Sequence, residues 1–570
     1  MKITSQKGFL GIDQRVKIQN SVSAANKMKN FRITESGSLT KRPDIVNVTR
    51  FDADIKGLWC GIFNNEEILI TVSDGFVFKL VPNDKIAIPQ MLGEVGLGVC
   101  HIFEFGGYLY FKTDTTYQKY DGVRLTDIVG YIPTIAINCL PNGEGEIFEP
   151  INLICDMRRQ LFSGDGNATA YKIAEDGVES LVSVTIDGNE LTSGYVFDSA
   201  TRQINFETPP KEAINNVEVV YAKFTPQEDK NRILKCTNIM FFGGNSDGRA
   251  FLWGNPDYPN YRFYSELANG APSVEYFPVN AYTVIGNTKI NCIAQQYDKQ
   301  LIFTKDRAYY SYSELKTDSL GNLYASFPVY ALNGNKGCLF EMQGVNIDNR
   351  PVTFCDDGLN MWESTSVVNE KNAVCFSQPI CDTVRDVLRR GVQNVKLFDF
   401  QANRELYFIV EDTAYIYNYG NGSWYCYDNM SCEHFTVFGT KLYFSYGNTL
   451  YMLSDDNNPS SSECVWESAF LTNGQNSGFL DVVGFDADLY VKGPINITFS
   501  FVKDNNTALA REFRFAEGDE GFRRISFRPA IKRTMPFALT HSVVGHGLCV
   551  LHGVNIKTRT KERSKRNGIL

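Results

Sequence analysis

The sequence predicts an all-β protein built as a β-propeller of six or seven blades. One motif recurs along the chain: two to four apolar residues, a short polar turn with Asp, Gly or Asn, and a second apolar or aromatic run. An example is EILITVSDGFVFKL from Glu67. Apolar and polar residues that alternate on both sides of a turn, with residues in the turn that tolerate positive φ, are typical of β-hairpins. Where no insert intervenes, copies lie roughly 35 to 55 residues apart, the period of a propeller blade. Further copies start at Tyr108, Ile239, Gln300, Pro351, Glu405 and Lys441.

Composition supports a large strand-rich core with attached modules. The 570 residues are 43% hydrophobic and 13% aromatic, and a chain of this length exceeds one ordinary domain. The net charge of −9 argues against a basic nucleic-acid-binding protein. Because no apolar run approaches a membrane span and MKITSQKGFLGIDQRV lacks an apolar signal region, we expect neither a membrane segment nor a signal peptide.

The 14 cysteines are scattered singly, and no CxxC motif occurs. Most of them stand inside apolar strands, which predicts free buried thiols in a protein that folds in a reducing compartment. A disulfide framework or a zinc site is the alternative.

Breaks in the blade pattern divide the chain. Pro141–Gly145 interrupts it, and short alternating strands with Asp-Gly and Pro-Pro turns follow, which predicts a small inserted β-sandwich. The linker Ser454–Glu463 precedes a second alternating region. We therefore predict an N-terminal arm with ring-closing strands (1–45), the first part of the propeller (46–145), the inserted sandwich (146–228), the second part of the propeller (229–456), a C-terminal β-sandwich (464–556) and a basic tail (557–570).

Smaller elements can also be predicted. In the arm we expect a turn of helix near Ala24–Lys29, then paired strands at Phe31–Ile33 and Leu39–Arg42. One further helix is expected after the blade at Met361. It has Ser377 as its N-cap, Pro379 in its first turn, an apolar stripe of Ile380, Val384, Val387 and Leu388, and Gly391 at its end.

A search for catalytic motifs yields little. The nearest match to a sialidase box, Phe354–Trp362, lacks the leading Ser, has its Trp one place late and occurs once. No HExxH or P-loop pattern occurs, and we expect no GxSxG nucleophile elbow. Acid pairs such as Asp356/Asp357 lie on turns or alternating strands, where carboxylates usually remain solvated. We predict no enzyme, no catalytic residue, no cofactor and no metal; one alternative is a metal held by His541, His546 and His552.

Two features are candidate contact sites. The first is the NPDYPN stretch, which is either a rigid loop packed by its own side chains or an exposed aromatic loop that docks another subunit. The second is the basic tail, which is either a solvated terminus or a contact for an acidic partner or DNA. The candidate subunit or adaptor contacts are Asn255, Pro256, Asp257, Tyr258, Pro259, Arg559, Lys561, Arg563, Lys565 and Arg566.

Several of these segments are similar to one family. The opening segment carries Asn30, Phe31, Gly37, Leu39, Arg42 and Pro43 in a phrase that resembles the start of tailed-bacteriophage tail hub, or nozzle, proteins (packaged DNA stabilisation proteins), with Asp44 where Gly is usual. The stretch RAFLWGNPDYPNYRFYSEL and the following Glu275–Gly286 resemble two further phrases of that family. LICDMRRQLFSGDGNATAYKI looks like the sandwich inserted in many members.

This resemblance implies a structural virion protein. It implies a homo-oligomeric, sixfold ring below the portal–adaptor complex of the phage tail, with distal tail or fibre proteins beneath it. Such a ring extends the channel for double-stranded DNA and helps to retain and release the packaged genome. Assembly would take place in the host cytoplasm, without a membrane. An acidic lumen that repels DNA phosphates is a hypothesis that the net charge permits.

Two other classes remain open. One is a carbohydrate-binding or carbohydrate-processing propeller, which predicts acids and aromatics at the mouth of the central channel and activity as a monomer. The other is a cellular interaction scaffold, which the two sandwiches favour less.

Overall fold

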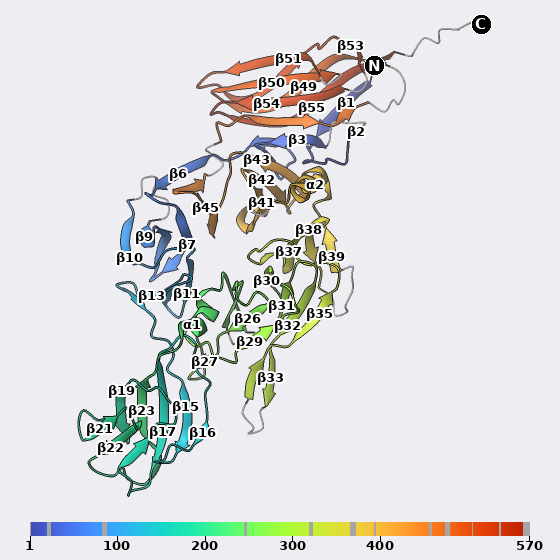
Figure 1. Cartoon of the computed structure of the whole chain (residues 1–570). Coiled ribbons are helices and arrows are strands. Elements are labelled where there is room, and N and C mark those ends of the chain that lie inside the picture. Colours follow the sequence, from blue (N-terminus) through green and yellow to red (C-terminus); the bar gives the residue numbers. More distant parts are fainter. Residues whose placement is uncertain are drawn as a thin grey trace.

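The computed structural model describes residues 2–19, 24–81, 88–243, 248–317, 323–364, 372–392, 395–454, 459–472, 479–503, 506–534 and 537–561. The regular secondary structure of the described chain is nearly all β-strand, with many small sheets arranged like the blades of a propeller (Figure 1). The prediction of an all-β, propeller-like protein is therefore confirmed.

Seven groups of four antiparallel strands form the propeller-like part of the described chain. The first three are β7 (Ile55–Phe63), β8 (Glu66–Ser73), β9 (Phe76–Leu80) and β10 (Gln90–Glu94); β11 (His101–Phe105), β12 (Tyr108–Lys112), β13 (Tyr117–Tyr120) and β14 (Leu125–Asp127); and β24 (Asn238–Phe242), β25 (Arg249–Trp253), β26 (Tyr261–Tyr264) and β29 (Tyr282–Val284). The next two are β30 (Cys292–Gln296), β31 (Lys299–Phe303), β32 (Ala308–Tyr312) and β35 (Val329–Asn333); and β36 (Val345–Ile347), β37 (Arg350–Cys355), β38 (Gly358–Trp362) and β39 (Ala373–Cys375). The last two are β40 (Val395–Phe400), β41 (Glu405–Val410), β42 (Thr413–Asn418) and β43 (Ser423–Tyr427); and β44 (His434–Phe438), β45 (Lys441–Tyr446), β46 (Thr449–Leu453) and β6 (Ile45–Arg50).

The polar tips of the repeated phrase form tight turns. Between β8 and β9, Asp74 and Gly75 have φ of 52° and 77°, and both central residues of a type I′ hairpin turn need positive φ. Asn64 and Asn65, between β7 and β8, also have positive φ. Asn, Asp and Gly reach this region at low cost, so the turns fix where each strand ends.

The last group of strands joins the two ends of the propeller segment. β6, which comes from the N-terminal part of the chain, pairs antiparallel with β46, with Ile45 opposite Leu453. A strand from the start of the chain thus completes a sheet formed near residue 450.

A second β-structure interrupts the chain between the second and third groups. Its sheets hold β15 (Thr134–Cys139), β16 (Glu146–Ile147), β17 (Met157–Gly164), β19 (Ser180–Ile186), β20 (Asn189–Glu190) and β23 (Ala213–Ala222) on one side, and β18 (Ala170–Lys172), β21 (Tyr195–Asp198) and β22 (Gln203–Phe206) on the other. They enclose a separate core that includes Phe162, Tyr171 and Val219. The expected start at residue 146 is wrong, because β15 already pairs with β17 in this sheet.

A buried lysine joins the two groups that flank this insert. The ammonium of Lys112, in β12, donates to the carbonyls of Leu234 (2.6 Å) and Cys236 (2.7 Å), at the point where the chain returns to the propeller. Two main-chain carbonyls therefore hold a cation that has been withdrawn from water.

The C-terminal sandwich contains strands from both ends of the chain. One sheet holds β4 (Phe31–Ile33), β5 (Leu39–Lys41), β55 (Leu548–Lys561), β49 (Phe479–Lys492), β52 (Glu520–Phe527), β1 (Lys2–Lys7) and β53 (Ile531–Thr534). The other side holds β2 (Ile18–Gln19), β48 (Phe470–Leu471), β54 (Phe537–Val544), β47 (Cys464–Ser468), β3 (Ala25–Lys29), β50 (Ile495–Lys503) and β51 (Asn506–Phe515).

The predicted helical turn at Ala24–Lys29 is wrong. Residues Ala25–Lys29 form strand β3, which pairs with β47 and also contacts β43, where Lys29 is opposite Cys426. β3 therefore makes one continuous sheet out of the sixth propeller group and the C-terminal sandwich. The largest buried core likewise runs from Cys292 through Trp466 to Ile556.

Two short helices lie against the sheets. α2 (Cys381–Arg390) follows a 3-10 turn (Gln378–Ile380) and ends at Gly391, whose φ is 64°. Ser377 does not cap it as expected, because its hydroxyl instead accepts from the Leu359 N–H at 2.9 Å. α1 (Gln227–Leu234) was not predicted, since its sequence QEDKNRIL has no apolar stripe.

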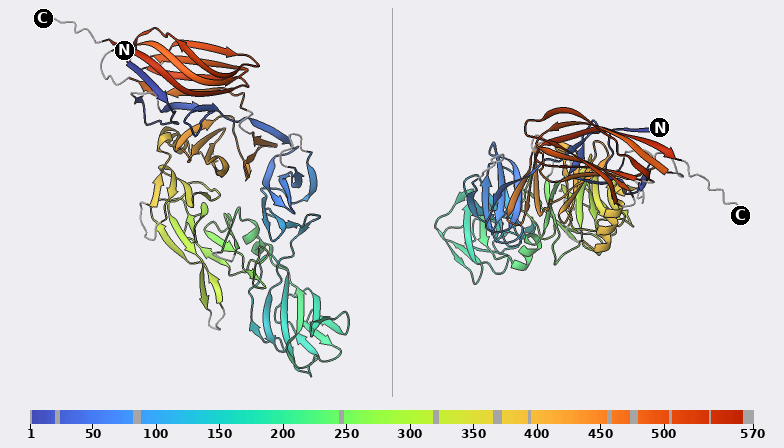
Figure 2. Two further views of the ribbon diagram at one scale, coloured as in Figure 1. Left: turned by 180° about the vertical axis from the view of Figure 1, so that it is seen from behind. Right: turned by 90° about the horizontal axis from the view of Figure 1, so that it is seen from above.

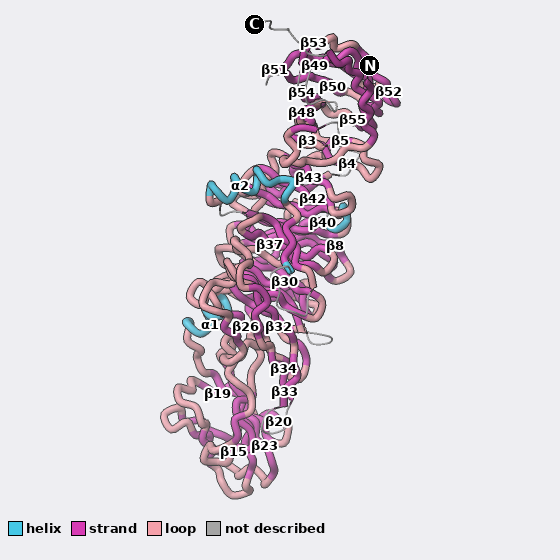
Figure 3. The backbone as a smooth tube through the Cα atoms, turned by 90° about the vertical axis from the view of Figure 1, so that its right-hand side faces the viewer, coloured by secondary structure: helices cyan, strands magenta, loops and turns pink. Residues whose placement is uncertain are grey.

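The whole molecule is elongated. The insert lies at one end, the propeller-like sheets in the middle and the C-terminal sandwich at the other end (Figures 2 and 3). β55 continues to Lys561, so residues 557–561 belong to a strand and not to a basic tail. Lys557 forms an ion pair of 2.8 Å with Asp486. Arg563, Lys565 and Arg566 lie outside the described residues.

Candidate functional site

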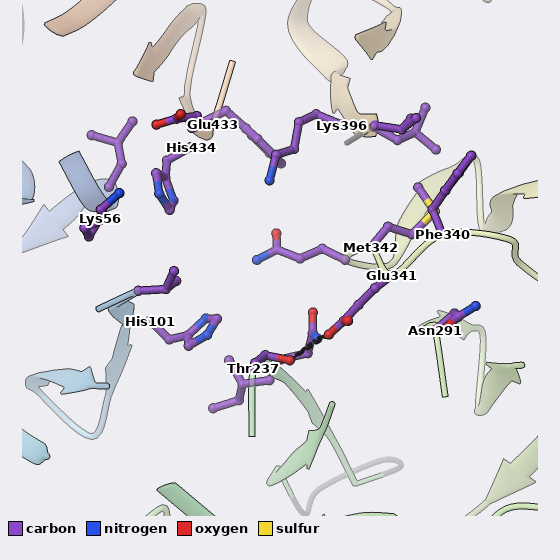
Figure 4. Close-up of a pocket in the computed structure, with 18 of the residues that line it drawn as sticks. Lys56, His101, Thr237, Asn291, Phe340, Glu341, Met342, Lys396, Glu433 and His434 are labelled. Atoms are coloured by element: carbon purple, nitrogen blue, oxygen red, sulfur yellow. Dashed lines mark hydrogen bonds between the residues drawn. The ribbon is translucent and has the colours of Figure 1, made fainter. Parts of the chain in front are cut away.

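A cavity of about 800 Å³ lies where the seven groups of strands meet. Residues in or near the first strand of every group line it: Lys56, His101, Asn238, Asn291, Met342, Lys396 and His434. All of these except Asn238 are labelled in Figure 4. It is the central cavity of the propeller-like part, and it contains side chains that are hundreds of residues apart in sequence.

Glu341 is one of two carboxylates that line the central cavity, and it is already engaged. Its Oε1 accepts from the hydroxyl of Thr237 at 2.7 Å and from the side-chain amide of Asn238 at 3.0 Å, while Oε2 accepts from the ammonium of Lys289 at 2.5 Å. A carboxylate with these partners holds neighbouring sheets together and is poorly placed to transfer a proton.

Glu433 lies on a different wall of the cavity from Glu341 (Figure 4). Glycosidases place two carboxyl groups on either side of one bond, and one of them needs a raised pKa. Glu341 and Glu433 do not form such a pair.

The two cavity histidines are neutral at pH 7. Burial lowers the pKa of His101 to about 3, with Lys112 and His434 adding a smaller effect. Burial, together with Lys396 and Lys56, lowers the pKa of His434 to about 4. The charged residues lining the cavity are therefore three lysines (Lys56, Lys289 and Lys396) and two glutamates.

The NPDYPN loop connects β25 to β26 and is packed by its own side chains. The buried Asn255 amide donates to the carbonyls of Asn231 (2.9 Å) and Arg232 (3.0 Å). Tyr258 packs edge-on against Tyr261 and Phe263. The outward residues Pro256, Asp257 and Pro259 are exposed, and Asp257 pairs with Lys235 at 2.7 Å. A subunit contact through these three residues stays a prediction, as does one through Arg559 and Lys561 at the end of β55.

The three C-terminal histidines do not converge. His541 is fully buried between the rings of Phe31 and Phe499. His552 lies in the sheet opposite His541 and bonds Ser38, and His546 is exposed in a turn. Among the described residues, no three His, Cys, Asp or Glu side chains come together as metal ligands.

Sequence reasoning missed the central cavity residues because no local spacing marks them. Lys56, His101, Lys396 and His434 occur singly. Their shared feature is a position in or beside the first strand of a four-stranded group. This feature identifies them only after the arrangement of the sheets is known. None of the helices in the described part of the chain is long and apolar enough to cross a membrane.

Comparisons with known proteins identify no relative at the sequence level: no family model and no curated protein matches. Among solved structures, Kluyveromyces lactis Hsv2 covers 66% of this chain and 98% of its own at 10% identity and a TM-score of 0.26. BBS1N, solved in complex with ARL6DN, covers 73% and 98% at 10% identity and a TM-score of 0.25. An exo-β-1,3-galactanase from Phanerochaete chrysosporium covers 82% and 97% at 8% identity and a TM-score of 0.17. Likenesses this low carry no information about activity or partners.

Proposed function

We propose that the protein is a structural subunit of a bacteriophage tail. It would be a tail hub or nozzle that forms a sixfold homo-oligomeric ring below the portal–adaptor complex. The ring would extend the DNA channel, contact distal tail or fibre proteins, and help to retain and release the packaged genome. The proposal starts from the phrases at Asn30–Pro43, Arg249–Leu267 and Glu275–Gly286, which resemble that family.

The observation that carries it furthest is the continuous sheet through β3. This strand joins the sixth propeller group to the C-terminal sandwich, and β1, β4 and β5 add to that sandwich from the start of the chain. The join leaves little room for hinge motion between the two parts. Such rigidity suits a component that transmits load along a tail.

We infer that the seven groups of strands are seven blades of a closed ring, with β6 as the closing strand. Closure removes the exposed sheet edges that would otherwise pair with other chains. Assembly into a larger ring would then use side chains and not strand edges.

The insert offers such side chains. Ile147 is 89% exposed, Ile214 80% and Val196 68%, all in the sandwich at one end of the molecule. We infer that these side chains contact a neighbouring copy, since heterologous contacts between copies close rings.

The test is to image the purified full chain by negative-stain electron microscopy, alone and mixed with the portal–adaptor complex of the same virus. We expect coaxial rings stacked on the adaptor. Ile147→Asp should reduce ring formation at least tenfold, on the order expected for a charge placed in an apolar contact. Val123→Asp, at an 81% exposed position in the propeller, is the matched control.

A monomer that ignores the adaptor would overturn the proposal. Binding of that monomer to a glycan array would instead favour the carbohydrate-binding alternative.

A further inference from the structure

Three sulfur atoms converge beside the central cavity. Cys292 begins β30, and Cys338 and Met342 lie on the segment before β36. The Cys338 Sγ is 3.2 Å from the Met342 Sδ, and the Cys292 and Cys338 thiols are in hydrogen-bond contact. Both cysteines are fully buried. A single buried thiol usually packs as a small apolar group, but two thiols and a thioether at one point form a set of soft donor atoms.

One residue, Asn291, holds all three of them in place. Its main-chain carbonyl accepts from the Met342 N–H at 2.9 Å, and its side-chain amide donates to the Cys338 carbonyl at 2.7 Å. Cys292 is its neighbour in the chain. These bonds fix the main chain that carries the three sulfur atoms, as a supporting shell does for a functional site.

Both thiols are buried outside the cavity lining, so a cation would reach them past Met342, which lines the cavity. Met342 and Asn291 both line it, on the same side (Figure 4).

We propose that Cys292, Cys338 and Met342 bind one soft monovalent cation, Cu(I). Thiolate and thioether ligands select Cu(I), whereas structural zinc sites use Cys, His or carboxylate ligands in sets of four. On binding, each thiol loses its proton to solvent, both sulfurs donate a lone pair to the metal, and the thioether donates a third. No electron is transferred.

A bound cation replaces the proton as the positive partner of the sulfur, so metal binding is coupled to proton release. The proposal does not depend on the phage-tail function.

The test uses the reduced full chain under argon, titrated with Cu(I) against bathocuproine disulfonate, a chromophoric Cu(I) chelator. We expect one equivalent of Cu(I) to resist the chelator, and X-ray absorption at the copper edge to show sulfur neighbours only. Cys338→Ser should abolish this tight binding. Met342→Leu, which keeps the volume and both thiols, should weaken it by about 10- to 100-fold. Cys139→Ser, a fully buried thiol of the insert, is the matched control.

Because Cys338→Ser could fail to fold, the thermal melting temperature gives a second measurement. One equivalent of Cu(I) should raise it in the unmodified chain and in Cys139→Ser, but much less in Met342→Leu. Equal affinity in Met342→Leu and the unmodified chain would assign the copper to other thiols and overturn the proposal. Complete removal of copper by the chelator from the unmodified chain would overturn it too.

Discussion

His101 and His434 show how the environment of a single residue decides its role in this protein. A histidine at the mouth of a propeller channel would be an obvious candidate for acid–base chemistry, since its ordinary pKa is near neutral. Here burial lowers the pKa of both to about 3 and about 4, and the nearby lysines act in the same direction. The two imidazoles are therefore neutral polar groups in the wall of the cavity.

The lowered pKa of His434 makes the folded chain less stable at low pH. The pKa of His434 is about 4 in the folded chain against a model-peptide value of 6.5. Below pH 6.5 the unfolded chain takes up the proton first, so stability falls as the pH falls towards 4. His434→Gln should remove about 2 kcal/mol of the stability that the unmodified chain loses between pH 7 and pH 5. Urea denaturation at both pH values measures this loss.

His546→Gln, at an exposed turn position, serves as the control and should leave the pH dependence unchanged. An identical loss in His434→Gln and the unmodified chain would show that His434 is solvated in solution.

At the scale of single elements, β3 shows why part of the fold could not be predicted. Its burial pattern does not alternate, because the register with β47 shifts between Ala25 and Lys27. Such a bulge places two residues opposite one and breaks the period of two on which strand prediction depends. The hairpins were predictable because their alternation and their Asn, Asp and Gly turns both act locally. β3 is fixed instead by partners more than 390 residues away.

Met28 is the residue of β3 that anchors this contact. It is fully buried, in the core that joins propeller and sandwich. Met28→Asp would place a charge there without a partner, at a cost of about 3 kcal/mol or more. Differential scanning calorimetry should then show the propeller and the C-terminal sandwich melting separately. Lys27→Asp alters an exposed position of the same strand, and a single transition in both variants would argue against β3 as the coupling element.

At the scale of the whole molecule, the sequence predicts an inserted sandwich but not how that sandwich is held against the propeller. The predicted boundary at residue 146 followed the Pro141–Gly145 break, which proves to be a turn between β15 and β16 of the insert itself. After β16 the chain returns to the propeller before entering β17, because Leu153 packs in a propeller core with Ile233 and Phe277. A docking point inside a long loop leaves no periodic signal.

Asn152 is the polar part of that docking point. It is fully buried; its amide donates to the carbonyls of Tyr131 (2.9 Å) and Glu275 (2.8 Å), and its Oδ1 accepts from the Phe277 N–H at 3.0 Å. Asn152→Ala removes these three hydrogen bonds to main-chain groups, which should cost about 2 to 4 kcal/mol. Because the insert keeps its own core, we expect it to stay folded but to change its angle to the propeller.

Small-angle X-ray scattering and hydrogen exchange test this together. The variant should show a broader distribution of interatomic distances and faster exchange at residues 149–156, with protection kept in β17 and β23. Asn142→Ala, whose side chain makes one bond within an exposed turn, should change neither. If Asn152→Ala scatters like the unmodified chain, the remaining contacts of this loop, including those of Leu153, are enough to fix the insert. If it also loses ring formation on the adaptor while still folded, the angle of the insert is what brings the exposed Ile147 and Ile214 against a neighbouring copy.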